Sequence, residues 1–199
     1  MFSGIGGFRA GLDRAGGFEC IGHCEIDKYA DASYRAMHNI REEEVYYSDA
    51  RSIDPAEMPE FQLLCSGLPC QSYSQAGTRK GLNDPRGALF FDMARLVEAK
   101  RPAFLLIENV PGLLSQDHGR ALGTILSTLN DLGYGIEWSP LFFAEVPGDT
   151  QPGVFQALFS PSAPGAASYQ YRTGFLMGLM VSLAMMPSPL SPPTEPINR

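Results

Sequence analysis

Two side chains suited to covalent and acid chemistry stand soon after short apolar runs of the sequence. Cys70 comes shortly after the run 61–65, and Glu108 comes directly after the run 104–107. Runs of this length predict buried strands, and the carboxyl ends of parallel strands meet at one edge of an α/β sheet. A cysteine thiolate is a strong nucleophile, and a buried glutamate is costly unless it has a task or a partner. The pattern therefore predicts a nucleophile and a carboxyl group at the same edge of a sheet.

A structural role is the alternative for Cys70, because free cysteine is among the most buried residue types. On residue type alone, that alternative is the better one. Pro69 restricts its own backbone and biases Leu68 towards an extended conformation, so the chain entering Cys70 is stiff and the sulfur can be aimed. The placement of Glu108 as a partner at the same edge favours the nucleophile.

A glycine-rich segment near the start of the sequence is followed by an acidic residue at a spacing that suits a nucleotide-like ligand. Residues 2–8 read Phe-Ser-Gly-Ile-Gly-Gly-Phe and precede a helix that we expect over 9–15. Glycines before a helix let a ligand approach the free amides of its N-terminus. A strand expected over 18–26 carries Glu25 near its end, about twenty residues after the glycines, where Rossmann-like folds bind ribose hydroxyls. An ordinary glycine loop is the alternative, and the acid makes a ligand site the better interpretation.

These motifs together resemble those of the DNA (cytosine-5) methyltransferases. Gly-Leu-Pro-Cys-Gln at 67–71 and Glu-Asn-Val at 108–110 resemble the catalytic motifs of that family, at the spacing that the family shows. Residues 2–8 and Glu-Ile-Asp-Lys-Tyr-Ala at 25–30 resemble its S-adenosylmethionine-binding motifs. The resemblance implies a Rossmann-like α/β fold, with a mostly parallel sheet and helices on both faces. It also implies S-adenosyl-L-methionine as the cofactor and double-stranded DNA with a flipped cytosine as the partner.

The resemblance assigns roles to individual residues of this sequence. Cys70 would add to C6 of a cytosine flipped out of the duplex, and Glu108 would hydrogen-bond or protonate N3, so that C5 accepts the methyl group. The role of Glu108 requires a raised pKa, which a buried strand end supplies. The cofactor-binding residues implied are Phe2, Gly4, Gly6, Gly7, Glu25, Ile26, Asp49, Pro69 and Leu89. The DNA-binding residues implied are Gln71, Ser74, Arg79, Lys80 and Arg86.

Two of these assignments have equally good alternatives. Asp49, which follows an expected strand over 45–47, can instead cap the turn after it. The glycine-punctuated segment 77–87, which carries the three basic residues, can bind a phosphate backbone or be a solvated loop. We also expect Asp27 to lie at the solvated start of a helix over 28–38, and the histidine that ends this helix to lie at the surface.

The composition is that of a globular protein with an acidic surface. The 199 residues have a formal net charge of −7, whereas nucleic-acid binding depends on clustered Lys and Arg, so any DNA-binding surface is local. The four cysteines include no Cys-x-x-Cys pair, which argues against a zinc module and a disulfide scaffold. The longest apolar stretch, 174–186, is short for a membrane span, and no charged-then-apolar leader opens the chain. We therefore expect a cytoplasmic monomer without metal or membrane association.

The resemblance ends near Trp138. Before it, strands and helices are expected to alternate, and we assign 1–140 to an S-adenosylmethionine-binding catalytic domain. Residues 141–199 form a divergent tail rich in Pro, Ser and Gly, which stands in place of the target-recognition region and is expected to be poorly ordered. Pro-Gly-Asp-Thr-Gln-Pro at 147–152 stands where the family has Gln-x-Arg-x-Arg, and no strand precedes Phe2. We therefore expect a fold that is incomplete at both ends, and a change of reading frame would explain the abrupt loss of the pattern.

The main interpretation is a DNA (cytosine-5) methyltransferase, with a restriction-modification system as its expected setting. One alternative is a catalytically impaired remnant that binds the cofactor without turnover. Another is a methyltransferase that acts on cytosine in RNA through the same chemistry. A Rossmann-type oxidoreductase is the weakest alternative, since its glycine fingerprint explains neither Gly-Leu-Pro-Cys-Gln nor Glu-Asn-Val.

Overall fold

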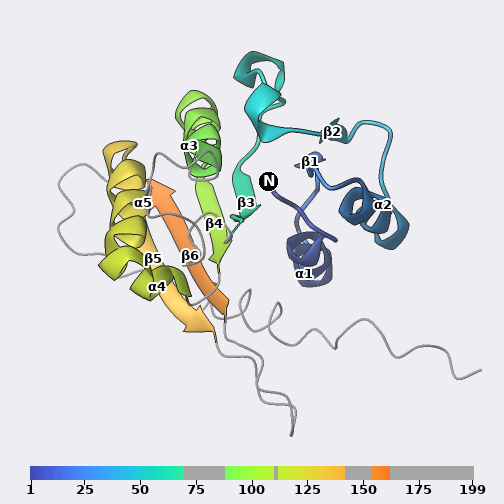
Figure 1. The fold of residues 1–199 in the computed structure, drawn as a ribbon. Helices are drawn as coiled ribbons and strands as arrows, with labels where there is room; N and C mark the ends of the chain where they lie inside the picture. Colours follow the sequence, from blue (N-terminus) through green and yellow to red (C-terminus); the bar gives the residue numbers. More distant parts are fainter. Residues whose placement is uncertain (70–87, 110–111, 142–153, 162–199) are drawn as a thin grey trace, which may run out of the picture.

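The computed structural model describes residues 1–69, 88–109, 112–141 and 154–161 (Figure 1). Its helices are α1 (Gly7–Ala15), α2 (Lys28–Met37), α3 (Ala88–Lys100), α4 (Gly112–Ser115) and α5 (Arg120–Asp131). Its strands are β1 (Gly22–Cys24), β2 (Val45–Tyr47), β3 (Leu63–Gly67), β4 (Phe104–Asn109), β5 (Tyr134–Leu141) and β6 (Val154–Pro161). Short 3-10 helices lie over Ala50–Ser52 (η1), Pro55–Glu57 (η2) and Gln116–Gly119 (η5). None of the helices in these ranges is long and apolar enough to span a membrane.

The strands form two groups. β1 pairs with β2 in parallel, and the second group has the order β3-β4-β6-β5. β3 and β4 are parallel, whereas β6 runs antiparallel to both β4 and β5. Helix α2 connects β1 to β2, and α3 lies between β3 and β4 in the chain, as parallel neighbours require. The fold is therefore of the expected α/β class, to which β6 adds an antiparallel part.

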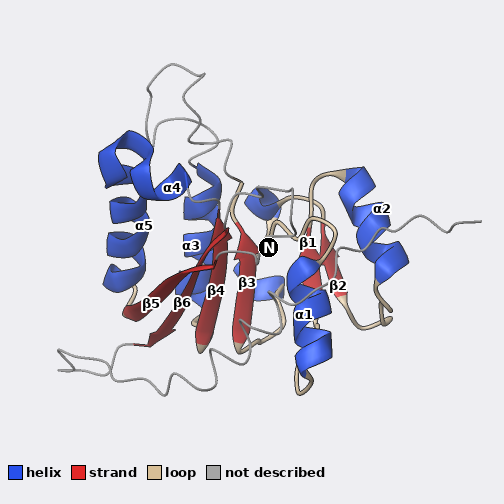
Figure 2. Cartoon of the chain, turned by 90° about the horizontal axis from the view of Figure 1, so that it is seen from below, coloured by secondary structure: helices blue, strands red, loops and turns tan. Residues whose placement is uncertain are grey.

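The first three residues lie between the two groups of strands (Figure 2). The Met1 nitrogen donates to the Cys65 carbonyl, and the Gly67 amide donates to the Met1 carbonyl at 3.3 Å. On the other side, the Ser3 amide donates to the Cys24 carbonyl at 3.0 Å. These backbone contacts join β3 to β1 through the segment that leads into the glycines.

An aliphatic core lies between the β3-β4 pair and the helices α3 and α5. Val97 of α3, Leu105 of β4 and Leu129 of α5 belong to it and are completely buried. Along α5, Ala121 and Ile125 precede Leu129 at spacings of four residues, so one face of the helix is directed inward. Burial of each large side chain of this kind stabilises the fold by about 2 kcal/mol.

Helices cover both faces of β1. The His23 ring stacks on Tyr34 of α2, with ring centroids 4.1 Å apart. Cys24, the next residue, packs in a second apolar cluster with Ala50 of η1 and Leu96 of α3. Because successive strand residues point to opposite faces, α2 and α3 lie on opposite sides of this strand. The expectation of helices on both faces is confirmed here.

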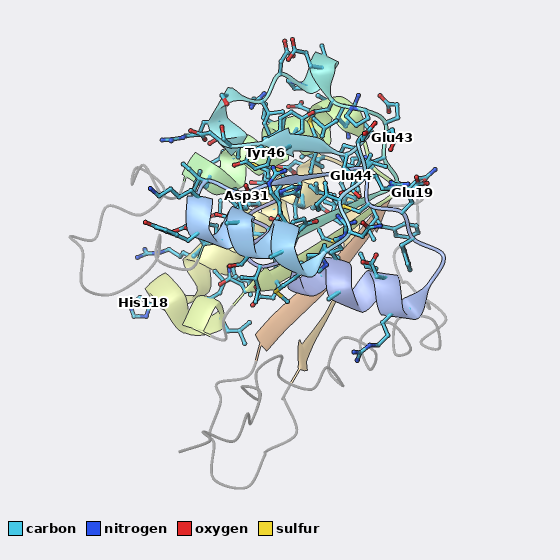
Figure 3. All side chains as sticks on the ribbon, turned by 90° about the vertical axis from the view of Figure 1, so that its right-hand side faces the viewer. Glu19, Asp31, Glu43, Glu44, Tyr46 and His118 are labelled. Carbon is cyan, nitrogen blue, oxygen red and sulfur yellow. The ribbon has the colours of Figure 1, made fainter. Side chains whose placement is uncertain are left out.

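A buried ion pair ties α1 to the loop before β2. The Arg9 guanidinium binds Glu44 through two hydrogen bonds of 2.6 and 2.9 Å, and it also donates to the Asn39 carbonyl at 2.8 Å. The Glu44 side chain is 0% exposed, whereas its neighbour Glu43 is exposed (Figure 3). Burial alone would raise the pKa of Glu44, but the bonds from Arg9 and Arg41 outweigh it and the pKa is lowered. No local pattern in the sequence predicts this pair.

Most expected elements are present, with differences at their ends. The strand over 45–47 and the helices over 9–15 and 28–38 are found as β2, α1 and α2. The strand expected over 18–26 is much shorter, since only Gly22–Cys24 pair with β2. β6 was not among the expected strands and lies within the segment 141–199. It pairs with β4 from Leu105 to Asn109 and with the whole of β5.

Candidate functional site

The glycine loop, residues 3–7, closes onto the end of β1. The Gly4 amide donates to Oε2 of Glu25 at 2.7 Å, and the Asp27 amide donates to Oε1 at 2.9 Å. Gly4 and Gly6 have φ angles of 54° and 90°, in the left-handed region that favours glycine. Each Glu25 oxygen keeps a second lone pair that can accept a bond from a ligand hydroxyl. Glu25 therefore fixes the loop and is still able to bind a ligand.

Apolar side chains are exposed beside this loop. Ile26, the residue after Glu25, is 64% exposed, and Ile5 within the loop is 48% exposed. Tyr29 in the first turn of α2 is 73% exposed. Apolar surface next to a few placed polar groups is typical of a ligand site.

Two aspartates near this site cap the helices that follow them. Asp27 accepts the amides of Tyr29 and Ala30 at 2.7 and 3.0 Å, which is the helix-start role expected for it. Asp49 accepts the Arg51 amide at 3.0 Å and binds the Arg51 guanidinium at 2.6 Å. These bonds from Arg51 lower the pKa of Asp49. The capping interpretation of Asp49 is therefore confirmed, and its contact with a cofactor stays a prediction.

The carboxyl group of Glu108 and the start of the chain both lie close to Gly67. Gly67 of β3 lies opposite Glu108 of β4 in the sheet. A Cβ atom added to Gly67 would lie 3.4 Å from Oε2 of Glu108 and 3.3 Å from the Phe2 carbonyl oxygen. Glu108 thus lies next to the segment that enters the glycine loop. Burial raises the pKa of Glu108 above its ordinary value, which favours the protonated form that a hydrogen-bond donor needs.

Asn109 ties the exit of β3 to the end of β4. Its side chain is almost completely buried, and Nδ2 donates to the Leu68 carbonyl at 3.3 Å. Leu68 is itself buried and is followed by Pro69, the last described residue before Cys70. The segment that enters Cys70 is therefore held against the end of β4, at the residue that follows Glu108 in the sequence. This bond gives the amide of the Glu-Asn-Val motif a structural role.

The structure brings together part of the expected site and does not describe the rest. The Gly4 amide binds Glu25, and Phe2 and Glu108 both lie close to Gly67. Gly7 is the first residue of α1, and Leu89 lies partly buried in the first turn of α3. The residues that fall outside the described ranges are Cys70, Gln71, Ser74, Arg79, Lys80 and Arg86.

Sequence reasoning did not assign roles to Gly67 or His38, and both lie at the site. Gly67 had a signal, because it opens the Gly-Leu-Pro-Cys-Gln motif directly after a strand. His38 had none, since a histidine at the end of a helix is ordinary. In the structure Nε2 of His38 lies 3.1 Å from the carbonyl oxygen of Ile5 in the glycine loop.

Cys24 and Cys65 have little thiolate character because their thiol pKa values are raised. Burial raises the pKa of Cys65 to about 12 and that of Cys24 to about 11. At neutral pH both are therefore thiols, which are poor nucleophiles. Across the part of the chain that the structure describes, no group of three or more His, Cys, Asp or Glu side chains is arranged to hold a metal ion.

Solved structures place this arrangement in the Rossmann-like methyltransferase fold. The structure of a Dnmt2 methyltransferase from S. pombe superposes with a TM-score of 0.64 at 18% identity, over 88% of this chain and 53% of that one. A putative DNA modification methyltransferase encoded within an E. coli prophage gives a TM-score of 0.58 at 22% identity, over 80% of this chain and 45% of that one. At such identities the likeness establishes the fold alone.

The sequence comparison is more specific. The model of the C-5 cytosine-specific DNA methylase family matches residues 1–146, and the chain belongs to this family. The orphan methyltransferase M.SPRI of Bacillus phage SPR is 45% identical over 138 residues, which are 69% of this chain and 31% of the relative. The type II methyltransferase M.HhaI of Haemophilus parahaemolyticus is 39% identical over 134 residues, 67% of this chain and 39% of the relative. The resemblance drawn from the motifs is confirmed, and the chain spans well under half the length of these relatives.

Proposed function

We propose that this chain carries the cofactor-binding and catalytic part of an enzyme that transfers a methyl group from S-adenosylmethionine to C5 of cytosine in double-stranded DNA. The observation that carries the proposal is that the Glu108 carboxyl group and the Phe2 carbonyl both lie close to Gly67. There, a carboxyl group of raised pKa stands beside the glycine loop and beside the strand that leads to Cys70. Family membership supports the same chemistry.

The residues of the glycine loop and of the β1 end fit S-adenosylmethionine. The Glu25 carboxylate would accept bonds from the ribose hydroxyls, and exposed Ile26 would pack on the adenine ring. The backbone of the glycine loop, at the N-terminus of α1, would face the methionine part, and Asp49 would bind the adenine amino group. The cofactor supplies an electrophilic methyl group on a sulfonium.

Cys70 and Glu108 divide the chemistry on the base. C5 of cytosine is a poor nucleophile, and it becomes reactive when the Cys70 thiolate forms a bond to C6. Glu108 donates its proton to N3 as that bond forms, so charge does not build up on the ring. C5 then takes the methyl group. Loss of the C5 proton to a base, cleavage of the bond from sulfur to C6 and return of the N3 proton release 5-methylcytosine and free Cys70.

The base must leave the duplex before Cys70 can reach it, because C6 is not accessible within the stack. We assign contacts with the flipped cytosine and with phosphates to Gln71, Ser74, Arg79, Lys80 and Arg86, which follow Cys70 in the sequence. The type II methyltransferase names of several relatives support a restriction-modification system as the setting of this activity.

Covalent capture on DNA tests this proposal. The full chain would be mixed with S-adenosylmethionine and a pool of duplexes with random sequence around a 5-fluorocytosine, whose fluorine cannot leave as a proton does. We expect an adduct that survives denaturation, and we expect none with Cys70→Ser. Cys20→Ser is the matched control, since Cys20 lies partly buried near Tyr34 and away from the motif, and it should retain the adduct.

The outcomes separate the alternatives. An adduct that persists in Cys70→Ser would contradict the assignment of the nucleophile. Cofactor binding without any adduct would identify a remnant without turnover, and an adduct on a matched 5-fluorocytosine RNA pool alone would identify an RNA substrate.

A substitution at Glu108 gives a second test with two readouts. Glu108→Gln keeps the shape but has no acid proton, so methyl transfer should fall roughly 100-fold. The pKa of Glu108 is raised by burial, so the folded chain loses stability as the pH rises from the unfolded-state pKa to the folded-state pKa. At pH 7 Glu108→Gln should therefore unfold at higher urea concentration than the wild type, and this advantage should vanish in acid. Glu98→Gln on the exposed face of α3 is the control and should change neither readout.

A further inference from the structure

We infer that His38 is a positioning residue that holds the glycine loop in the conformation that receives the cofactor. The inference deepens the proposed function and rests on it. His38, at the C-terminal end of α2, contacts this loop more than thirty positions earlier in the sequence. No sequence motif includes this contact.

The glycine loop is held from two sides. On the β1 side, the Ser3 hydroxyl donates to the Cys24 carbonyl at 3.1 Å and the Gly4 amide binds Glu25. On the α2 side, Nε2 of His38 lies 3.1 Å from the Ile5 carbonyl oxygen. A carbonyl can only accept, so this nitrogen carries the proton and donates it. The Ile5 peptide is therefore oriented by His38.

The same ring explains why residue 6 is glycine. A Cβ atom at Gly6 would lie 2.2 Å from Nε2 of His38 and 2.8 Å from Cδ2 of Tyr34. Both distances are far below contact, so a side chain at this position would displace the ring. Gly6 also has a φ of 90° and stands at the N-terminus of α1. The loop thus needs glycine twice, once for its backbone angle and once to admit His38.

The His38 ring is itself fixed by its surroundings. Its backbone amide donates to the Tyr34 carbonyl at 3.0 Å at the end of α2. Its ring packs on the Tyr34 ring, with centroids 4.7 Å apart. Tyr34 is buried, and its ring also stacks on the His23 ring. The Arg9 guanidinium lies over the Tyr34 ring, with Cζ 5.7 Å from the ring centroid. The hydrogen-bond donor to Ile5 is therefore preorganised, which is what a positioning residue requires.

The consequence is that cofactor affinity depends on a side chain that does not belong to the binding motifs. Without the bond from His38, the Ile5 peptide can rotate and the loop samples other conformations. The cofactor must then order the loop when it binds, and this lowers its affinity. A single hydrogen bond of this kind corresponds to roughly a fivefold to tenfold change in the dissociation constant.

The experiment compares variants of His38 in the full chain. The dissociation constant of S-adenosylmethionine is measured by calorimetry for the wild type, His38→Ala, His38→Leu and His38→Gln. We expect the Ala and Leu variants to bind roughly fivefold to tenfold more weakly, and the Gln variant to recover affinity because its amide can donate to Ile5. His118→Ala is the control, since His118 is exposed on η5 and points away from the molecule (Figure 3).

A second readout does not need the cofactor. The Gly6 amide donates to the Ser3 carbonyl at 2.9 Å, so its hydrogen exchange reports opening of the loop. Exchange at Gly6 should be faster in His38→Ala and His38→Leu and close to wild type in His38→Gln. If wild-type affinity and exchange persist in the Ala and Leu variants, the inference is overturned. If exchange changes as expected but the wild type binds no cofactor, the loop contact stands and the proposed function fails.

Discussion

The two groups of strands are stabilised in different ways. Around β3 and β4, large aliphatic side chains such as Leu105 and Leu129 are completely buried against α3 and α5. Around β1 and β2, the outer face is built from directional contacts, including the Arg9 pair with Glu44 and the bond of His23 to Asp31 at 2.8 Å. The β3-β4 region is stabilised by burial of apolar side chains. The outer face of the β1-β2 region is stabilised by hydrogen bonds and ion pairs.

The difference corresponds to what each region has to position. Apolar packing depends on volume and tolerates small shifts in direction, whereas a hydrogen bond fixes both partners. The glycine loop and Glu25 must present single atoms to a ligand, and they lie in the region with the directional contacts. We therefore expect substitutions in the β3-β4 region to lower global stability, and substitutions in the β1-β2 region to alter the ligand site as well.

The largest loss of stability is expected in the aliphatic core. Leu129→Ala removes a fully buried side chain of α5 and should lower the free energy of unfolding by about 3 kcal/mol. Urea denaturation followed by circular dichroism measures it. Leu114→Ala, at a leucine that is 37% exposed, is the matched control and should stay within about 0.5 kcal/mol of wild type. Equal losses in the two variants would contradict the assignment of the core.

An intermediate loss is expected when the buried ion pair is broken. Glu44→Gln removes the buried carboxylate that Arg9 binds and leaves Arg9, among the described residues, only the exposed Asp13 carboxylate at 3.5 Å, so it should lower the free energy of unfolding by about 2 kcal/mol at pH 7. Glu43→Gln alters the exposed neighbour and should have little effect.

The same pair predicts a dependence on pH. The pKa of Glu44 is lowered from its unfolded value of 4.5, so the stabilisation is complete above that value and is lost as the pH falls through the folded-state pKa. The wild type and Glu44→Gln should therefore approach each other in acid. A constant difference between them across this range would show that the effect of the substitution is not the ion pair.

The smallest loss is expected at the link between β1 and α2. Asp31 binds His23 through one oxygen and Arg35 through the other, at 2.8 and 2.9 Å. Asp31→Asn should cost about 1 kcal/mol, because the bond to His23 is shielded from water. Arg35→Met removes the outer pair, in which the Arg35 side chain is 42% exposed, and the exposed contact of its guanidinium with the Tyr46 ring at 4.6 Å, and should cost about 0.5 kcal/mol. Thermal unfolding would rank the two variants, and the reverse order would contradict the view that the inner bond carries the stability.

The sequence was sufficient for elements whose signal is local. β2, α1 and α2 follow from runs of apolar residues and from helix composition, and the motifs around Glu25 and Glu108 place those residues at strand ends. The aspartates that cap helices are also local signals, which is why the role of Asp27 was predicted.

Contacts between distant residues could not be predicted in the same way. Glu44 is the last of three consecutive glutamates, and only the position of Arg9, 35 residues earlier, decides that it is the buried one. His38 looked like an exposed helix end because its partner is a backbone carbonyl in the glycine loop. β6 follows the point where the family pattern ends, and it pairs with the much earlier strand β4 as well as with β5, the strand just before it.

The position of β6 has a consequence for the order in which the sheet is completed during synthesis. β6 separates β4 from β5, so β5 is attached to the rest of the sheet through β6. A ribosome releases β4 and β5 well before residues 154–161 emerge. Until then β4 is paired with β3 on one edge only, and the backbone groups on its other edge, which later pairs with β6, are unpaired. In this interval the nascent chain has an open strand edge, the kind of surface on which chaperones and aggregation partners compete with folding.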